Sequence, residues 1–308
     1  MNAKINLAVC LDNNYVMPTT VLLSSIGYNK KDETIDVYAI SEKPLSEESK
    51  SVMTQECAKY DMNIFFIDYN ISERPELKNV KIGRWSLAAF LKLYIAILVP
   101  EDIEKILYLD GDMIVRHSLK ELWDIDIAEY SMAGVMDANQ FGNGVMSTVY
   151  YDCPKFKYIN TGTLLLNVKR IRKNNTIHEF DNFLLENGQS LGYVDQDVYN
   201  NVLYNQKLIL STKFNAQYAS YIKPQYRITP IEEENIMDLL RDPVIVHFTE
   251  KFKPWYACCP HPFASDFDKY LRMTIFKNNK KSYERTTFKD MLKYILLKLG
   301  LFVKLRRL

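Results

Sequence analysis

The sequence predicts an α/β protein with a parallel sheet. Short apolar runs alternate with segments of helical periodicity, a pattern typical of βαβ units. Polar clusters directly follow several of these runs, and open α/β sheets bind ligands beyond the carboxyl ends of their strands. The chain has 308 residues, 47% hydrophobic and 25% charged, which is enough for one large domain or two small ones.

The first half of the chain alternates regularly between the two patterns. Apolar runs bounded by polar residues predict strands at 5–11, 35–40, 63–67 and 105–109. Apolar residues at helical spacing predict helices at 16–29, 45–60 and 87–98. The second half is less regular, and its predicted elements are strands at 131–136, 158–168 and 244–248 and a helix at 194–204.

The charges divide unevenly along the chain. The formal net charge is +1, but residues 277–308 contain ten Lys or Arg and only two acids. An anionic surface is therefore expected as the partner of the tail alone, and no nucleic acid as a partner of the body. The five cysteines form no CxxC pair, which favours a reducing compartment. The N-terminal apolar run ends at Asp12, too early for a signal peptide, so a cytoplasmic body is expected.

The motif YLDGD, residues 108–112, ends an apolar run with two carboxylates. Asp110 and Asp112 lie on one face of an extended segment, where like charges repel unless a cation separates them. A divalent metal would relieve this repulsion, and Gly111 would let a ligand approach closely. A simple turn is the alternative interpretation, because Asp and Gly are common turn residues.

The chain offers no obvious backbone cradle for phosphate. It has only ten glycines and neither GxGxxG nor GxxxxGK[ST], so a bound diphosphate would need a metal and lysines instead. In the segment HFTEKFKPW, residues 247–255, Lys251 and Lys253 are candidate phosphate contacts. His247 is either a third metal ligand or a core histidine, and a mixed oxygen and nitrogen ligand set favours Mn²⁺ over Mg²⁺.

Two further motifs are unspecific when taken separately. INTG, residues 159–162, could be a turn that opens a buried strand, and in DQD, residues 195–197, Asp195 could cap a helix. In this order, however, LDNNY, YLDGD, INTG, DQD and HF-x4-KPW resemble the family 8 glycosyltransferases. The resemblance spans residues 5 to 265, and it is strongest to the bacterial lipopolysaccharide galactosyl- and glucosyltransferases, which also carry a basic, apolar tail.

The resemblance implies a single, Rossmann-like A-type glycosyltransferase domain at 1–270 and a basic amphipathic tail at 271–308. It implies transfer of galactose or glucose from a UDP-sugar, with retention of configuration, to a saccharide, glycolipid or glycoprotein acceptor in cell-surface glycan synthesis. The cofactor would be Mn²⁺, with Mg²⁺ as the alternative. The hexose, the acceptor and the linkage stay open.

The resemblance also implies residue roles. It assigns the metal to Asp110, Asp112 and His247. It assigns the nucleotide and the donor sugar to Asp12, Asn14, Tyr15, Lys92, Asp110, Gly111, Asp137, Asn160 and Lys253, with Lys92 standing where the family usually has Arg. It places Gln196 and Asp195 at the reacting sugar, and whether retention uses a covalent intermediate or same-face attack stays open.

Two other classes of protein could use parts of this pattern. A haloacid dehalogenase-type phosphatase also has an apolar-DxD segment, but that segment usually opens the fold. A non-enzymatic sugar-nucleotide or membrane-surface binding protein would not need three metal ligands beside donor-sugar residues. Release of UDP from a UDP-hexose in the presence of Mn²⁺ would separate a transferase from such a binding protein.

The C-terminal residues 286–308 have the pattern of an amphipathic helix. The predicted apolar face consists of Phe288, Met291, Leu292, Ile295, Leu299 and Phe302. The predicted basic residues around and beyond it are Lys289, Lys293, Lys304, Arg306 and Arg307. Such a helix is expected to lie on the anionic inner face of the cell membrane, and a helix docked on the body is the alternative.

Overall fold

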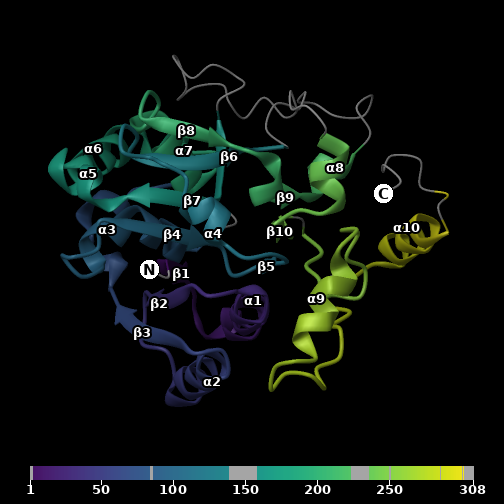
Figure 1. Ribbon diagram of the computed structural model, residues 1–308. Helices are drawn as coiled ribbons and strands as arrows, with labels where there is room; N and C mark the ends of the chain where they lie inside the picture. The colour runs from purple at the N-terminus through teal and green to yellow at the C-terminus, as the bar shows by residue number, and fades with distance from the viewer. Residues whose placement is uncertain are drawn as a thin grey trace.

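The computed structural model describes residues 3–83, 86–138, 158–222, 236–249, 251–284, 286–299 and 301. Within these residues, seven strands form one sheet in the order β3-β2-β1-β4-β7-β6-β8 (Figure 1). Their bounds are β1 Lys4–Cys10, β2 Thr34–Ser41, β3 Met62–Asp68, β4 Lys105–Leu109, β6 Met132–Met136, β7 Ile159–Asn167 and β8 Lys207–Leu210.

Helices cover both faces of this sheet. One face packs on α1 (Val16–Asn29) and α2 (Glu47–Ala58), through a core that includes Leu7 and Val9 of β1. The other face packs on a second set of elements: the 3₁₀ helix η4 (Leu87–Tyr94), α3 (Ile95–Leu98), α5 (Val168–Lys173), α6 (Thr176–Asn187) and α7 (Val194–Val202). Successive side chains of a strand point to opposite faces, so Ala8 belongs to this second core.

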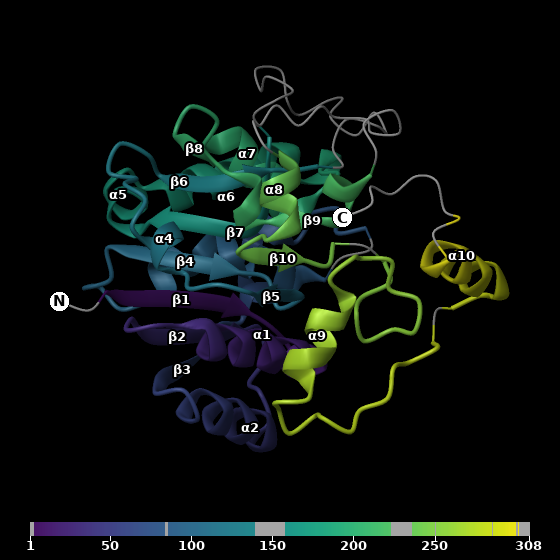
Figure 2. The same ribbon diagram turned by 45° about the vertical axis from the view of Figure 1, so that its right-hand side comes forward.

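A small second sheet lies beside the first (Figure 2). In the described residues it has the order β5-β10-β9, with bounds β5 Met113–Val115, β10 Ile245–His247 and β9 Ala216–Gln217. The remaining helices are α4 (Lys120–Trp123), α8 (Ile236–Arg241) and α9 (Ala264–Leu271), and α9 packs on α1 through a third core. Short 3₁₀ turns occur at 13–15, 71–73, 75–77, 188–190, 212–214 and 218–221.

The predicted strands of the first half are confirmed, as are the helices predicted at 16–29 and 45–60, and the β3-β2-β1-β4 portion is parallel. The prediction of a parallel sheet is wrong for β7, which runs antiparallel to both β4 and β6. A strand buried on both faces has the same apolar sequence whichever way it runs, so periodicity could not show its direction. The segment predicted as a helix at 87–98 is a 3₁₀ helix over 87–94 that continues into α3.

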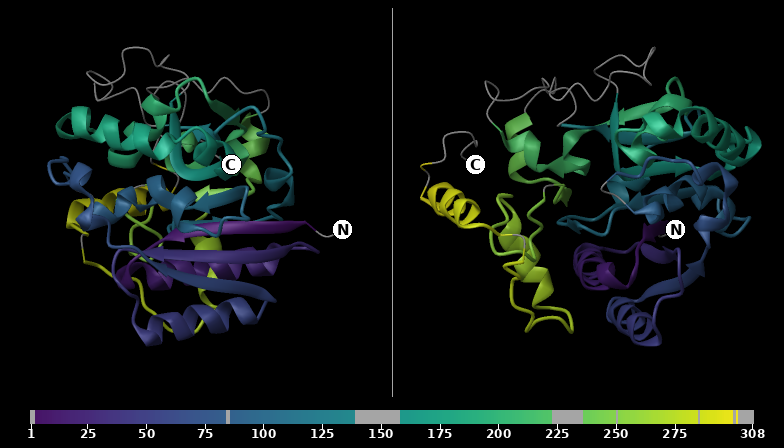
Figure 3. Two further views of the ribbon diagram at one scale, coloured as in Figure 1. Left: turned by 90° about the vertical axis from the view of Figure 1, so that its left-hand side faces the viewer. Right: turned by 180° about the vertical axis from the view of Figure 1, so that it is seen from behind.

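The helix predicted near the C-terminus is present as α10 (Phe288–Lys298), which lies outside α9 at the edge of the molecule (Figure 3). Thr287 begins it with a reciprocal capping box to Asp290. The described part of the predicted apolar face is exposed by 39–82%: Phe288, Met291, Leu292, Ile295 and Leu299. Phe302, Lys304, Arg306 and Arg307 lie outside the described residues. None of the described helices combines the length and apolar content that crossing a membrane requires.

Candidate active site

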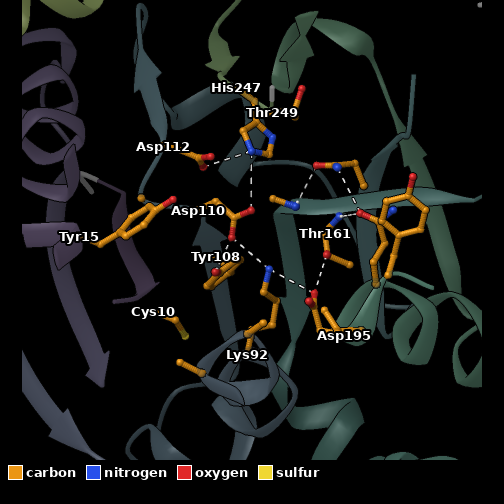
Figure 4. A pocket seen from close by; sticks show the side chains of 18 of the residues that line it. Cys10, Tyr15, Lys92, Tyr108, Asp110, Asp112, Thr161, Asp195, His247 and Thr249 are labelled. Atoms are coloured by element: carbon orange, nitrogen blue, oxygen red, sulfur yellow. Dashed lines mark hydrogen bonds and ion pairs between the residues drawn. The ribbon is translucent and has the colours of Figure 1, made fainter. Parts of the chain in front are cut away.

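A cavity of about 760 Å³ lies beyond the carboxyl ends of β1 and β4 (Figure 4). The two strands are parallel neighbours, and β2 lies on the other side of β1, so the strand order reverses there. Such a reversal leaves a crevice in which α/β proteins bind ligands. All the predicted site residues except Asn14 line this cavity: Asp12, Tyr15, Lys92, Asp110, Gly111, Asp112, Asp137, Asn160, Asp195, Gln196, His247 and Lys253.

Three predicted metal ligands come together on one side of the cavity. The Nε2 atom of His247 is 3.3 Å from Asp112 Oδ1 and 3.7 Å from Asp110 Oδ2. Strand pairing brings them together, because His247 in β10 is paired with Met113 in β5 and the Phe248 amide donates to the Asp112 carbonyl. His247 is thus far from Asp112 in sequence but adjacent to it in the fold.

This cluster fits a divalent metal ion. One ligand atom from each of the three residues lies within 4.8 Å of the other two. Ligand atoms about 2.1 Å from one ion lie roughly 3–4 Å apart, so small side-chain adjustments would complete the coordination. Two carboxylates and one neutral imidazole suit Mn²⁺, whereas an all-oxygen set would suit Mg²⁺.

Two glycines allow the backbone to pack closely around the cluster. A Cβ atom on Gly162, the last residue of INTG, would lie 2.3 Å from Cε1 of His247. A Cβ atom on Gly111 would lie 2.7 Å from the Oγ1 atom of Thr19 in α1. Any larger residue at position 162 would therefore displace the imidazole ring.

Lys253 forms a hydrogen bond with Asp112 Oδ2, the carboxylate oxygen that does not face His247. Its Nζ atom donates to Asp112 Oδ2 at 2.7 Å and to the Phe248 carbonyl at 2.6 Å. Burial disfavours the ionised form of Asp112, but Lys253 and His247 outweigh it and hold the pKa of this carboxyl well below its usual range. The carboxylate is therefore charged at neutral pH and available to a metal.

Lys92 connects the two carboxylates on the other side of the cavity. Its buried Nζ atom lies 3.0 Å from Asp110 Oδ1 and 3.2 Å from Asp195 Oδ2 (Figure 4). Burial lowers the pKa of a lysine, but the two carboxylates outweigh this effect and raise the pKa of Lys92 above its ordinary value. Burial raises the pKa of Asp195, and Lys92 offsets only part of this rise. Lys92 thus links Asp110, a predicted metal ligand, to Asp195, a predicted catalytic residue.

Amide side chains line the remaining wall of the cavity. Asn160 Nδ2 donates to Asp137 Oδ2 at 3.1 Å and to Gln196 Oε1 at 3.2 Å, and Gln196 Nε2 donates to Asp137 Oδ2 at 3.0 Å. Thr161 donates through its Oγ1 atom to Asp195 Oδ2 at 2.7 Å. Residues from β7, from α7 and from the position directly after β6 are therefore held as one polar group that could bind sugar hydroxyls.

The LDNNY segment forms the opposite wall. Asp12 caps the turn that follows β1 by accepting hydrogen bonds from the amides of Asn14 and Tyr15. The Tyr15 ring packs edge-on against Trp255 with centroids 6.0 Å apart, so the KPW segment reaches across to this wall. Asn14 is exposed and bonded to Asp12 rather than lining the cavity.

The sequence interpretation missed several residues that position the site. Tyr108 donates to Asp110 Oδ1 at 2.6 Å, Gln217 bonds the backbone on either side of Asp137, and the Oδ1 atom of Asn215 lies 3.0 Å from His247 Nδ1. Tyr108 and Thr161 stand inside the quoted motifs and could have been found. Asn215 and Gln217 belong to no motif, and only the fold brings Gln217 to the cavity and Asn215 to His247 behind its wall.

Comparison with known proteins agrees with this geometry. The family model described as Glycosyl transferase family 8 matches residues 6–259. General stress protein A of Bacillus subtilis (strain 168) is 28% identical over 87% of this chain and 93% of its own length. Lipopolysaccharide 1,3-galactosyltransferase of Salmonella typhimurium (strain LT2) is 24% identical over 86% of this chain and 77% of its own length.

The fold also has solved counterparts. The crystal structure of the galactosyltransferase LgtC, in complex with donor and acceptor sugar analogs, superposes with a TM-score of 0.75 at 21% identity. The match covers 88% of this chain and 96% of that one, and it supports the A-type glycosyltransferase fold. Because the family model spans most of the sequence, the chain belongs to glycosyltransferase family 8.

Proposed function

We propose that the protein transfers galactose or glucose from a UDP-hexose to a saccharide acceptor, with retention of configuration and with Mn²⁺ as cofactor. The observation that carries this proposal is the cluster of Asp110, Asp112 and His247 at one end of a cavity whose other wall is a group of amides. The chain has no glycine-rich phosphate loop, so a metal and lysines must balance the charge of the diphosphate. Residues 1–270 would form the catalytic domain.

The positions of the side chains suggest how a UDP-hexose would bind. The uridine would lie near Asp12 and Tyr15, with Trp255 closing the wall behind it. The diphosphate would lie at the carboxylate and imidazole cluster, where a bound divalent metal would act as a Lewis acid toward the leaving group. Lys253 is 17% exposed and could turn from Asp112 to a phosphate oxygen.

The sugar would lie against Asp137, Asn160, Asp195 and Gln196. Gln196 Oε1 already accepts from the Thr161 amide and from Asn160, so this amide is held in place as a platform. Asp195 supplies the negative charge that would balance an oxocarbenium-like sugar. The bond from C1 of the hexose to UDP breaks with its electron pair on the phosphate oxygen. The acceptor oxygen bonds to C1, and its hydroxyl proton leaves with UDP, whose new phosphate charge accepts it.

The family match does not favour a phosphatase of the haloacid dehalogenase type or a binding protein without activity. The test of the proposed function is a panel of UDP-sugars, in which release of free UDP is measured with Mn²⁺, with Mg²⁺ and with EDTA. Metal-dependent release from UDP-galactose or UDP-glucose is expected. Equal release in EDTA, or none from any UDP-sugar, would contradict the proposal.

We also propose that residues 271–308 hold the enzyme on the anionic inner face of the cell membrane. Four large apolar side chains of α10, together with Leu299 just beyond it, are exposed, and Lys289 and Lys293 lie on the same helix. Burying such a face in lipid gains apolar free energy, while each nearby basic residue adds about 1 kcal/mol on anionic headgroups. The location would bring the cavity to a lipid-anchored acceptor, in keeping with relatives that are lipopolysaccharide glycosyltransferases.

Deleting residues 286–308 should abolish cosedimentation with vesicles that contain anionic lipid and leave release of UDP unchanged. Ile295→Glu, in the exposed apolar face, should weaken vesicle binding in the full-length chain because a carboxylate opposes both the apolar and the electrostatic contribution. Tyr283→Glu is the matched control, since Tyr283 is also an exposed large apolar residue but lies outside α10. A truncated protein that still cosediments, or that unfolds, would favour a helix docked on the body.

A further inference from the structure

Asn215 is fully buried between His247, a predicted metal ligand, and Asn160, one of the amides that line the cavity. It follows the turn at 212–214 and precedes β9. Its Oδ1 atom is 3.0 Å from Nδ1 of His247, and its Nδ2 atom is 2.9 Å from Oδ1 of Asn160. One side chain thus contacts a predicted metal ligand and a predicted sugar-binding residue.

Neighbouring groups that can only donate, or can only accept, determine which atoms of Asn160 and Asn215 are donors and which are acceptors. The backbone amide of Gly162 can only donate, and it donates to Oδ1 of Asn160 at 3.1 Å. The Nδ2 atom of the same Asn160 side chain donates to the carboxylate of Asp137, which can only accept when it is ionised. The orientation of Asn160 is therefore determined from both ends.

The orientation of Asn215 follows in turn. Because Asn160 presents an oxygen to it, Asn215 must donate through Nδ2 and present its own oxygen to His247. The Oδ1 atom of Asn215 carries no hydrogen, so its contact with Nδ1 of His247 at 3.0 Å is a hydrogen bond only if Nδ1 carries the hydrogen. The lone pair that can bind a metal is then on Nε2, the atom that faces Asp110 and Asp112.

We propose that Asn215 is a positioning residue that keeps the hydrogen of His247 on Nδ1 and couples the metal cluster to the sugar-binding amides. The chain of contacts runs from Asp137 through Asn160 and Asn215 to His247, and each member sets the direction of the next. The role in metal binding rests on the function proposed above, whereas the position of the hydrogen is a property of the metal-free protein. Outer partners of this kind commonly change metal affinity by about 10- to 100-fold.

The hydrogen position can be measured directly in metal-free protein with ¹⁵N-labelled histidine at pH 8, with His247→Gln assigning the resonances. Nδ1 of His247 should show the shift and coupling of a hydrogen-bearing nitrogen. His261 is the internal reference, because its Nδ1 accepts from the Phe263 amide and its Nε2 faces the Ala216 carbonyl. Burial lowers the pKa of His261 to about 3, so it stays neutral. A hydrogen-free Nδ1 on His247 would overturn the proposal.

Two variants separate the two contacts of Asn215. Asn215→Leu removes both and should weaken Mn²⁺ binding in the presence of UDP by about 10- to 100-fold, measured by calorimetry. Asn215→Asp keeps an acceptor for Nδ1 of His247 but loses the donor to Asn160. It should hold Mn²⁺ affinity within a few fold of wild type and weaken binding of UDP-hexose relative to UDP. Equal loss of Mn²⁺ affinity in both variants, or none in Asn215→Leu, would overturn the proposal.

The His247→Ala background shows whether Asn215 acts through the imidazole. In that background Asn215→Leu should cause no further loss of Mn²⁺ affinity, because the two residues form one interaction. An additive loss would mean that Asn215 acts by another route and would overturn the proposal. If the wild-type protein binds no Mn²⁺ with UDP, the proposed function fails, and the histidine measurement alone then decides the role of Asn215.

Discussion

Asp112→Asn should lower turnover of a UDP-hexose by about 10³-fold while the protein stays folded, because it removes a charged ligand of the metal that would stabilise negative charge on the leaving group. The asparagine has nearly the same shape, and Lys253 can keep its bond to the Phe248 carbonyl. Release of UDP at a fixed Mn²⁺ concentration that just saturates the wild type measures the rate, and circular dichroism with urea unfolding measures the fold. Asp61→Asn is the matched control, since Asp61 is exposed and an asparagine tolerates its positive φ of 52°.

The lower turnover of Asp112→Asn should result from weaker metal binding. The Mn²⁺ affinity of Asp112→Asn in the presence of UDP should fall together with its turnover. If Asp112→Asn retained full activity, and retained it in EDTA, then neither the carboxylate nor a metal would take part in the reaction. The interpretation of the cluster as a metal centre would then be wrong.

Lys92→Met should destabilise the protein by about 3–5 kcal/mol at neutral pH, because it leaves the buried carboxylate of Asp195 without its cation. The side chains of Lys92 and Asp195 are each only 7% exposed, so water cannot replace the lost contact. Urea unfolding measures the difference in the free energy of unfolding. Turnover should also fall strongly, since Asp195 would become protonated and lose its charge toward the donor sugar.

The pH dependence of this effect has a definite sign. Burial already raises the pKa of Asp195, and removing Lys92 raises it further. A carboxyl whose pKa is raised in the folded state costs its full stability above the folded pKa, and this cost declines to zero as the pH falls from the folded to the unfolded pKa. The difference between wild type and Lys92→Met should therefore shrink on acidification. Lys92→Arg, which keeps the charge, is the matched control and should retain most of the stability; an equal loss in both variants would contradict the ion-pair account.

Most of the site could be predicted because its residues directly follow buried strands. Asp12 follows β1 and Asp110 follows β4, and the parallel pairing of these strands places the two segments at one edge of the sheet. The motif YLDGD therefore marked the cavity without any knowledge of long-range contacts. His247 was harder, because it joins Asp110 and Asp112 only through the pairing of β10 with β5.

Other features depend on contacts that leave no local pattern. The donor contact of Lys92 stays a prediction, and its ion pairs with Asp110 and Asp195 were not expected from the sequence. Asn215 is a single buried amide in an irregular segment, and its importance follows only from its two neighbours. The direction of β7 and the 3₁₀ geometry at 87–94 likewise result from tertiary packing, which overrides local periodicity.

Calorimetric titration of UDP into the wild-type protein, with Mn²⁺ and again with EDTA, tests the central claim most directly. If the acidic cluster holds a metal against the diphosphate, UDP should bind with Mn²⁺ and bind far more weakly in EDTA, because two carboxylates would then repel the phosphates. Equal affinity under both conditions would contradict the account.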